Sequence, residues 1–461
     1  MAEEIEILKM LDESKTDIIK YILAILGGLG GFLFGYDTGI IGDAIIFAEQ
    51  TLHLTSFLIG LSVASVTLGA AIGAISSGII SDYLGRKYTL IMDALIFTIF
   101  AILLALSIND LMFVVTRTIL GFAIGVDSVI GPVYIAEFAP KNTRGRLLTF
   151  QQLMIVVGIF VSYWVGYALS FSGNWRLMIG LGAIPGIIIA AFRFYMPESP
   201  RFAIIKNKVN ELNQALKRFG LIVDQTAIQK VRKLQEFESQ FSARDLFRKA
   251  VLPITLFAIG AALFQQFDGI NVFIYYSATI FEHLGYSPTS ATFTAGWVTG
   301  FGNLYPVFIA QFLLVDRIGR KLSLVVSFIG MAIALLLGSW LVSLTSYIAG
   351  LSLLAATMIY LFFFQIGSGP VLWDIMPEIF PTALRGRGSS ILAFFVWIGD
   401  FVVSFTFPIL LYSIGISYVF LIYGIISALG ILFFWFLTPE TKGKSLEELS
   451  KELWYSKLRK A

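Results

Sequence analysis

Several ionisable side chains of this sequence stand inside long apolar stretches. Asp37 ends the run Gly30-Gly-Phe-Leu-Phe-Gly-Tyr-Asp37, and Arg117 lies within a second apolar run. A charged carboxylate at the middle of a membrane costs roughly 2.5–3.5 kcal/mol, and the cost falls if the carboxyl binds a proton or pairs with a cation. Arg117 is well placed to be that cation. The two residues therefore predict either a proton-binding switch or a purely structural ion pair.

Uncharged amides form a second group in similar surroundings: Gln151, Gln152, Gln265, Gln266, Asn271 and Asn303. An amide both donates and accepts hydrogen bonds, as sugar hydroxyls do. Such amides also join membrane helices to one another, by bonds worth about 0.6 kcal/mol each. Trp373 and Trp397 could stack on the C–H face of a pyranose or could belong to an interfacial belt.

The composition indicates which kind of secondary structure holds these side chains in place. Of the 461 residues, 57% are hydrophobic and 14% are charged, whereas soluble domains carry roughly 25% charged residues. Apolar runs such as 21–36 and 88–108 approach the roughly 20 residues that cross a hydrocarbon core. Because backbone groups find no water partner in lipid, these runs must be helices of a membrane protein.

The same composition argues against several other classes of protein. A net charge of +3 is too small to indicate a nucleic-acid partner, and the absence of cysteine excludes disulfides and thiolate chemistry. The two histidines, His53 and His283, lie near different predicted outer loops. We therefore expect no metal site, no cofactor and no enzymatic activity.

Twelve spans predict an all-α membrane protein built of two six-helix bundles. The first six are 19–42, 56–81, 88–107, 112–136, 147–170 and 176–196; the second six are 250–282, 290–315, 321–343, 347–373, 387–412 and 417–437. The expected domains are an N-terminal half (1–200), a linker (201–249), a C-terminal half (250–440) and a tail (441–461). The linker is rich in charged residues, and 207–219 and 224–241 resemble amphipathic helices on a membrane surface.

Basic residues concentrate in the loops on one side of these spans. The positive-inside rule places that side, the linker and both termini in the cytoplasm. The N-terminal segment is charged and does not resemble a signal peptide, which agrees with this orientation. We expect a multi-pass protein of the cell membrane.

The two halves repeat one another. Asp82-Tyr-Leu-Gly-Arg-Lys87 recurs 234 residues later as Asp316-Arg-Ile-Gly-Arg-Lys321, and Pro197-Glu-Ser199 recurs 242 residues later as Pro439-Glu-Thr441. Glu137 and Arg144 recur 241 residues later as Glu378 and Arg385. Parallel repeats related by an axis along the membrane normal suit alternating access, in which one half rocks against the other.

These repeated motifs also resemble a known family. Gly78-Ile-Ile-Ser-Asp82-Tyr-Leu-Gly-Arg-Lys87 is similar to the inner-loop signature of the major facilitator superfamily. Pro197-Glu-Ser-Pro-Arg201, Gln265-Gln-Phe-Asp-Gly-Ile-Asn271 and Pro439-Glu-Thr-Lys-Gly443 resemble the sugar porter family. That family includes facilitative glucose transporters and bacterial proton–sugar symporters. The resemblance runs from Gly30 to Gly443.

The resemblance implies a sugar-binding set of Gln152, Gln265, Gln266, Asn271, Asn303, Gln365, Trp373, Trp397 and Asp400. At three positions this sequence differs from the family pattern. Gln365 stands where a glutamate is frequent, Asp400 stands where an asparagine is frequent, and Asp268 lies inside the glutamine signature. The sequence does not identify the sugar. The stretch Gly367-Ser-Gly-Pro370 should break the tenth span and provide a hinge.

The resemblance also bears on energy coupling. Symporters of the family carry an aspartate matching Asp37 and an arginine matching Arg117, whereas uncoupled members tend to carry asparagine. We expect a monosaccharide:proton symporter that functions as a monomer in the lipid bilayer. Facilitated uniport, with Asp37 silent, is the alternative, and a sugar sensor is disfavoured by the short tail. Asp93 and Asp127 are secondary candidates without a partner that the sequence can name.

Charged residues at the cytoplasmic helix ends are expected to form a weak latch that closes the inner gate. This set comprises Asp82, Arg86, Glu137, Arg144, Glu198, Asp316, Arg317, Arg320, Glu378, Arg385 and Glu440. Exposed ion pairs are individually worth under about 1 kcal/mol, which suits a gate that opens in every cycle.

Overall fold

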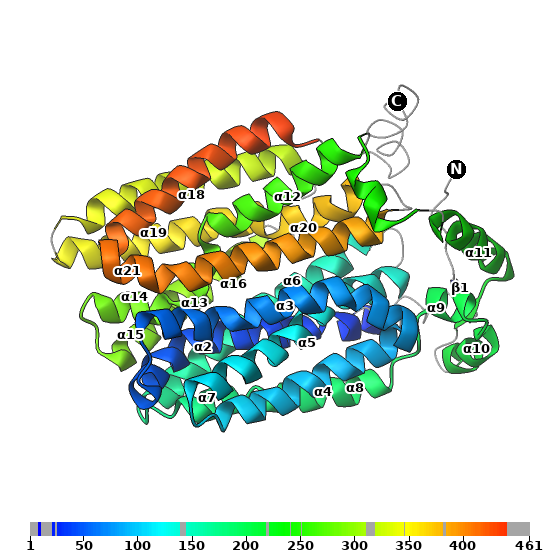
Figure 1. Ribbon diagram of the computed structural model, residues 1–461, viewed down its shortest axis with the longest axis horizontal. Helices are drawn as coiled ribbons and strands as arrows, with labels where there is room; N and C mark the ends of the chain where they lie inside the picture. Colours follow the sequence, from blue (N-terminus) through cyan, green and yellow to red (C-terminus); the bar gives the residue numbers. More distant parts are fainter. Residues whose placement is uncertain are drawn as a thin grey trace.

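A computed structural model of the chain describes most of its length. The described residues are 8–10, 21–23, 25–138, 144–217, 221–239, 241–249, 251–309, 319–344, 346–380 and 384–439. Nearly all of them are helical, and the long helices run side by side along one direction in two layers (Figure 1).

The N-terminal layer contains five long helices and a sixth span in two pieces. They are α2 (Gly30–Leu52), α3 (Ser56–Leu84), α4 (Arg86–Ala105), α5 (Asp110–Phe138), α6 (Arg144–Ser170), α7 (Trp175–Gly180) and α8 (Ala183–Phe194). Glycines allow these helices to pack closely: a Cβ at Gly158 of α6 would lie 2.8 Å from the Tyr36 nitrogen of α2. Small residues at such contacts are how membrane helices associate.

The C-terminal layer is more interrupted. It contains α12 (Leu252–Phe267), α13 (Ile270–Tyr275), α14 (Ser277–His283), α15 (Pro288–Ala295), the π-helix η2 (Gly296–Phe301), α16 (Gly302–Ile309), α18 (Arg320–Val342), α19 (Ser346–Ile366), α20 (Ser368–Ile379) and α21 (Arg385–Leu437). α21 holds two of the expected spans, separated at Gly415, whose φ is 82°.

Ten helices in the described part of the chain are long and apolar enough to cross a membrane. One of them, Arg387–Leu437, contains the expected eleventh and twelfth spans. α15, η2 and α16 together cover most of the expected eighth span, which the π-helical turn divides. The described helices therefore accommodate twelve spans.

Two helix breaks within the C-terminal layer leave backbone N–H and C=O groups without their usual partners in the helix. The predicted break near Gly367 is confirmed, because α19 ends at Ile366 and α20 begins at Ser368. The expected single span 250–282 is wrong in detail: it breaks at Gly269, which has a φ of 92° that favours glycine. The Asp268 carboxyl accepts a hydrogen bond from the Ile270 nitrogen at 3.1 Å and so caps the new helix.

The first span is longer than predicted. α2 continues past residue 42 and ends at Leu52, where His53 adopts the left-handed conformation (φ 52°). Asp43, one residue beyond the predicted end of the span, is fully buried inside this helix. Its carboxyl packs against Gly166 of α6, which has no side chain to obstruct it.

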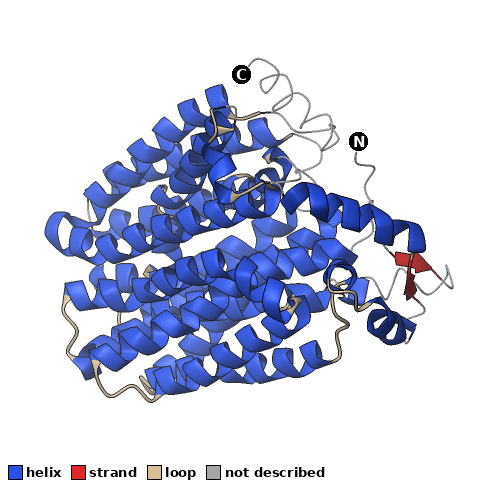
Figure 2. Cartoon of the chain, turned by 45° about the vertical axis from the view of Figure 1, so that its right-hand side comes forward, coloured by secondary structure: helices blue, strands red, loops and turns tan. Residues whose placement is uncertain are grey.

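A small cap of linker helices projects beyond one end of the bundle (Figures 1 and 2). The short 3₁₀ helix η1 (Ala243–Phe247) at the end of the linker packs instead against α12 and α21 of the C-terminal layer. The cap contains α9 (Pro200–Ile205), α10 (Val209–Lys217) and α11 (Gln225–Ser239). An unpredicted element completes it: β1 (Leu8–Met10) pairs antiparallel with β2 (Leu221–Val223), with Leu8 opposite Val223. The N-terminal segment thus docks on the linker.

Candidate functional site

The predicted ion pair lies in the interior of the N-terminal half. Arg117 of α5 is fully buried and Asp37 of α2 is 3% exposed. Arg117 Nη1 donates to Asp37 Oδ1 at 3.1 Å, and Arg117 Nε reaches the Val63 carbonyl at 3.5 Å. Among the described residues, Asp37 Oδ2 and Arg117 Nη2 have no hydrogen-bond partner. The pair therefore rests on one hydrogen bond and leaves bonding capacity unused on both sides.

A second buried cation was missed by the sequence analysis. Arg193 of α8 donates to Asp93 Oδ1 and to Asp127 Oδ1, both at 2.5 Å, and to the Leu90 carbonyl at 2.6 Å. Asp93 and Asp127 are thus paired, although we named no partner for them. Arg193 was overlooked because it lies near the predicted cytoplasmic end of its span, where a basic residue is also explained as a topological signal.

The two clusters differ in how many strong contacts each guanidinium makes. Among the described residues each cluster leaves buried polar atoms without a hydrogen-bond partner, Arg193 Nε and Asp93 Oδ2 in the second as Arg117 Nη2 and Asp37 Oδ2 in the first. The Arg193 guanidinium makes three short contacts and joins three helices, which suits a permanent structural tie. The Arg117 guanidinium makes one contact with a carboxylate. Of the two clusters, the Asp37–Arg117 pair is better suited to break and re-form during a reaction cycle.

The amides of the Gln-rich signature form a chain of hydrogen bonds. Asn271 Nδ2 donates to Gln266 Oε1 at 2.6 Å, and Gln266 Nε2 donates to Gln265 Oε1 at 3.3 Å. Gln265 Nε2 donates to the Ser368 carbonyl at 2.8 Å, next to the break between α19 and α20. This chain links α12 and α13 to the predicted hinge. The structure therefore gives these amides partners in addition to any ligand.

Gln365 and Asn303 form a second pair near the same break. Gln365 Nε2 donates to Asn303 Oδ1 at 2.8 Å, and Asn303 Nδ2 donates to the Thr299 carbonyl at 2.8 Å. Gln365 Oε1 is buried and has no hydrogen-bond partner in the part of the chain that the structure describes. It is an acceptor that a hydroxylated ligand could satisfy.

Asp400 connects α21 to α13. Its carboxyl accepts hydrogen bonds from the Tyr275 hydroxyl at 3.1 Å and the Ser404 hydroxyl at 2.8 Å, and the Asn271 amide also interacts with it. Tyr275 in turn lies near enough to Arg117 and Asp37 to feel their charges. Tyr275 and Ser404 were not predicted, because isolated hydroxyls in apolar runs carry no distinctive pattern.

The remaining candidates occupy different environments. Trp397 is 3% exposed, and its ring lies 5.1 Å from that of Phe34 in the N-terminal half. Its Nε1 has no hydrogen-bond partner among the described residues. Trp373 of α20 and Gln152 of α6 are half-buried. Asp268 is fully buried and accepts from the Tyr360 hydroxyl at 2.8 Å, so it supports the helix break at Gly269.

At the linker end of the bundle, Glu198 caps α4. Glu198 Oε1 accepts hydrogen bonds from the backbone nitrogens of Arg86 (2.9 Å), Lys87 (3.2 Å) and Ser199 (2.7 Å). The first two are N–H groups of the helix start, which have no partner within the helix. Burial raises the pKa of the Glu198 carboxyl, although these three N–H groups act in the opposite direction.

Arg86 joins this cap to two further predicted gate residues. Its Nη1 lies 3.3 Å from Asp82 Oδ1, and its Nε lies 3.7 Å from Glu137 Oε1. The Ser199 hydroxyl also donates to Glu137. These described contacts all lie within the N-terminal half.

The other predicted gate residues are described only in part. Asp316, Arg317 and Glu440 lie outside the described residues, and so do the side chains of Arg144, Glu378 and Arg385. Arg320 begins α18. A latch between the halves therefore stays a prediction.

At the end of the bundle away from the linker, the two halves are in contact. Tyr163 of α6 donates to the Ile274 carbonyl of α13 at 2.6 Å. A Cβ at Gly42 of α2 would lie 2.9 Å from the Tyr275 carbonyl, and the Phe57 and Phe405 rings are 5.3 Å apart. The structure is therefore a form in which this end is closed.

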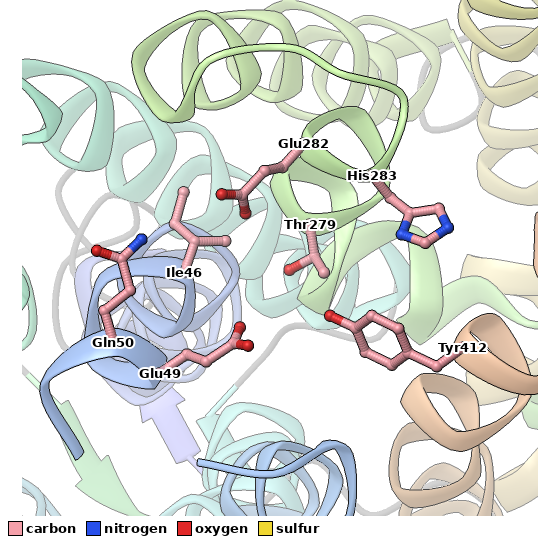
Figure 3. Close-up of a pocket in the computed structure, with 7 residues that line it drawn as sticks. All are labelled: Ile46, Glu49, Gln50, Thr279, Glu282, His283 and Tyr412. Carbon is pink, nitrogen blue, oxygen red and sulfur yellow. The ribbon is translucent and has the colours of Figure 1, made fainter. Parts of the chain in front are cut away.

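A hollow of about 270 Å³ remains on the outer side of this contact. Glu49 of α2 and Glu282 of α14 project into it from opposite halves, beside Thr279 and Tyr412 (Figure 3). Among the described residues, no group of three or more acidic, histidine or cysteine side chains is arranged to hold a metal.

Comparison with known proteins assigns this architecture. Residues 23–453 match the family model described as "Sugar (and other) transporter". The chain belongs to this sugar transporter family. It is 36% identical over 441 residues to the glucose transporter GlcP of Staphylococcus epidermidis, covering 94% of this chain and 97% of that protein. It is also 36% identical over 433 residues to a D-xylose transporter of Levilactobacillus brevis, covering 93% and 94%.

A solved structure of this sugar transporter family shares the fold. The major facilitator superfamily proton:xylose symporter XylE of E. coli, bound to 6-bromo-6-deoxy-D-glucose, superposes with a TM-score of 0.80 at 29% identity, over 95% of this chain and all of that one. The predicted family and the predicted twelve-helix major facilitator fold are confirmed. The fold is that of membrane transporters.

Proposed function

We propose that this sugar transporter carries a monosaccharide together with protons by alternating access, with Asp37 as the coupling carboxyl. The observation that carries the proposal is the buried Asp37–Arg117 pair, held by a single hydrogen bond with unused capacity on both partners. A proton that neutralises Asp37 removes the attraction to Arg117, so protonation and helix movement are linked. The similarity to a proton:xylose symporter supports this proposal.

The cycle follows from the charge of this pair. Protonation of Asp37 while it faces outward loosens its contact with Arg117 and favours closure around the sugar. Release of the proton on the cytoplasmic side restores the ion pair and resets the carrier. A paired Asp37 belongs to the deprotonated form, and the closed end of the present structure suits the stage after that release.

The sugar site is proposed at the polar groups of the C-terminal half. Gln265, Gln266, Asn271, Asn303, Gln365 and Asp400 supply donors and acceptors, with Gln152 facing them from the N-terminal half and Trp373 and Trp397 as apolar walls. Gln265, Gln266 and Asn271 lie beside the break at Gly269, and Gln365 lies beside the break at Gly367, which ties ligand contacts to hinge movement. The relatives that carry glucose and D-xylose support a hexose or pentose as the substrate.

The cytoplasmic placement of both termini remains part of the proposal, as does the gate. The Arg86–Glu137–Glu198 cluster and its repeat in the C-terminal half would close the inner end while the carrier faces outward. The carrier is proposed to act as a monomer in the cell membrane.

Uptake into proteoliposomes tests the proposal. D-xylose and D-glucose uptake is measured with and without an inward proton gradient, for the parent and for Asp37→Asn. The parent should concentrate sugar only with the gradient, and Asp37→Asn should keep exchange of internal for external sugar but lose accumulation. Uptake that merely equilibrates in both proteins under every gradient would make the protein a uniporter.

A further inference from the structure

Asp43 is a buried carboxyl that the proposed cycle does not use. It lies six residues after Asp37 in α2, and its side chain is 0% exposed. Neither of its carboxyl oxygens has a hydrogen-bond partner in the described part of the chain. Asp37, by contrast, has Arg117. Such a carboxyl needs an explanation, because an ionised carboxylate without a partner in a buried site costs several kcal/mol.

The contacts of Asp43 lie on α6. Its Cβ and Cγ lie 2.7 Å from the position that a Cβ on Gly166 would occupy, so this glycine provides the space for the carboxyl. Tyr163, one turn earlier on α6, is close enough to feel the charge of Asp43. Its hydroxyl is already committed to the Ile274 carbonyl of the opposite half.

The C-terminal half completes the enclosure. Gly42, the neighbour of Asp43, abuts the Ile274 and Tyr275 carbonyls, at 3.1 and 2.9 Å from a Cβ built at that glycine. Next to Ile274, the Ser277 and Thr299 hydroxyls bond to one another at 2.7 Å. The carboxyl therefore sits beside the contact that closes the end away from the linker. Opening that end withdraws α13 from α2.

Other charged and titratable groups around Asp43 have different partners. Arg117 pairs with Asp37, and Arg176 of α7 donates to the Ser107 carbonyl at 2.9 Å. On the outer side of the closed end, Glu49 of α2 and Glu282 and His283 of α14 line the hollow (Figure 3). On α6 the titratable neighbour of Asp43 is Tyr163, and on α13 Tyr275 donates to Asp400. In the described part of the chain no cation forms an ion pair with Asp43.

We propose that Asp43 is a second proton-binding site, which must be occupied for the end of the carrier away from the linker to close. In the closed form the carboxyl is dry, unpaired and neutral. When the halves separate there, water reaches Asp43 and the proton exchanges with the outer solution. The proton enters and leaves on the same side, so it sets the balance between open and closed forms and is not part of the transported stoichiometry.

The inference rests on the rocking motion of the proposed function but not on coupling through Asp37. It is therefore tested in the Asp37→Asn background, where that carboxyl no longer titrates. The chain has no cysteine, so nitroxides can be placed at Phe57→Cys and Phe405→Cys, whose rings touch across the halves. The dipolar coupling between the two nitroxides, which reports their separation, is measured by electron paramagnetic resonance as a function of pH.

The expected result is a closed population that grows relative to the open one by up to about tenfold per unit fall in pH, the limit for one linked proton. Adding Asp43→Asn should hold the carrier closed at every pH and abolish the shift. Adding Glu49→Gln, Glu282→Gln and His283→Gln instead should leave the shift in place. Asp43→Ser serves as a second neutral variant if Asp43→Asn does not fold.

A pH-dependent shift that survives both neutral variants of Asp43 would overturn the inference. So would a shift that disappears with the three substitutions at Glu49, Glu282 and His283 while Asp43 is intact. A failure of the proposed function would be detected by a different experiment. The parent protein would then only equilibrate sugar in the uptake assay, whatever the result of the spin-label measurement.

Discussion

At the scale of single residues, two buried arginines differ in their contacts, and this difference suggests different roles. One stabilises the fold, and the other can release its carboxylate during transport. Arg193 is bound by two carboxylates and a carbonyl, whereas Arg117 holds one carboxylate through one nitrogen. A guanidinium that holds two carboxylates through short hydrogen bonds has little to gain from movement. We therefore assign stability to the Arg193 cluster and coupling to Asp37 with Arg117.

Replacing Arg193 by methionine should destabilise the protein by about 3–5 kcal/mol, because two carboxylates are left buried without their cation. Thermal unfolding in detergent measures the change. The matched control is the triple variant Arg193→Met, Asp93→Asn, Asp127→Asn, which removes all three charges and should recover most of the loss. Equal stability of Arg193→Met and the parent would refute the structural assignment.

The sequence predicted the first pair and not the second, for a physical reason. Asp37 and Arg117 both lie well inside apolar runs, where only burial with a partner explains them. Arg193 lies near a helix end, where exposure is equally reasonable until the packing of α8 on α4 is known. Asp43 was missed because the first span was predicted to end at residue 42, whereas α2 continues to Leu52.

At the scale of elements, the helix starts and breaks determine where polar groups can lie. Glu198 provides the start of α4 with acceptors, and Gly269 and Gly367 free backbone groups in the C-terminal half. The break at Gly367 was predicted from its glycine–proline stretch. The break at Gly269 was not, because a single glycine in a helical run is usually tolerated and the positive φ is visible only in the structure.

Glu198→Ala should cost about 0.5–2 kcal/mol, the usual loss for a helix cap, while Glu198→Gln keeps an acceptor and should stay close to the parent. Because the folded-state pKa of Glu198 is raised, the stability that this group contributes is present at low pH and is lost as pH rises through that pKa. Melting curves over a pH series should show this decline in the parent and its absence in Glu198→Gln. A glutamine variant as unstable as the alanine variant would contradict the cap.

Gly269→Ala should destabilise the C-terminal half by about 1–2 kcal/mol through the left-handed backbone alone. A clash adds to this, since the new Cβ would lie 2.8 Å from the Tyr423 ring. Gly78→Ala in α3 is the control, because no atom lies within 4 Å of its Cβ position and alanine favours a helix. Thermal unfolding should separate the two variants, and equal melting temperatures would argue against a strained break at Gly269.

At the scale of the whole molecule, the two halves meet at the end away from the linker, and their movement must part that contact. A cysteine pair at Phe57 and Phe405, joined by a short bifunctional reagent, should abolish sugar uptake because α3 and α21 can no longer separate. Each single-cysteine variant treated with the same reagent should keep its activity. Normal uptake by the cross-linked protein would contradict alternating access through this end.

The overall architecture was predictable because apolar length and repeated loop motifs specify twelve spans in two halves, and the fold comparison confirms it. The hydrogen-bond chain from Asn271 to Ser368 was not predictable beyond its members. Which amide bonds which depends on the breaks that bring α12 and α20 together. The docking of β1 on β2 likewise depends on contacts between segments far apart in the sequence.

The most direct test of proton coupling is the proton movement that sugar itself causes. Sugar is added to weakly buffered proteoliposomes without an imposed gradient, and external pH is recorded for the parent and for Asp37→Asn. The account predicts that sugar entry by the parent draws protons inward and makes the medium transiently alkaline, and that Asp37→Asn exchanges sugar without this change. Sugar entry by the parent with no proton movement would contradict the account.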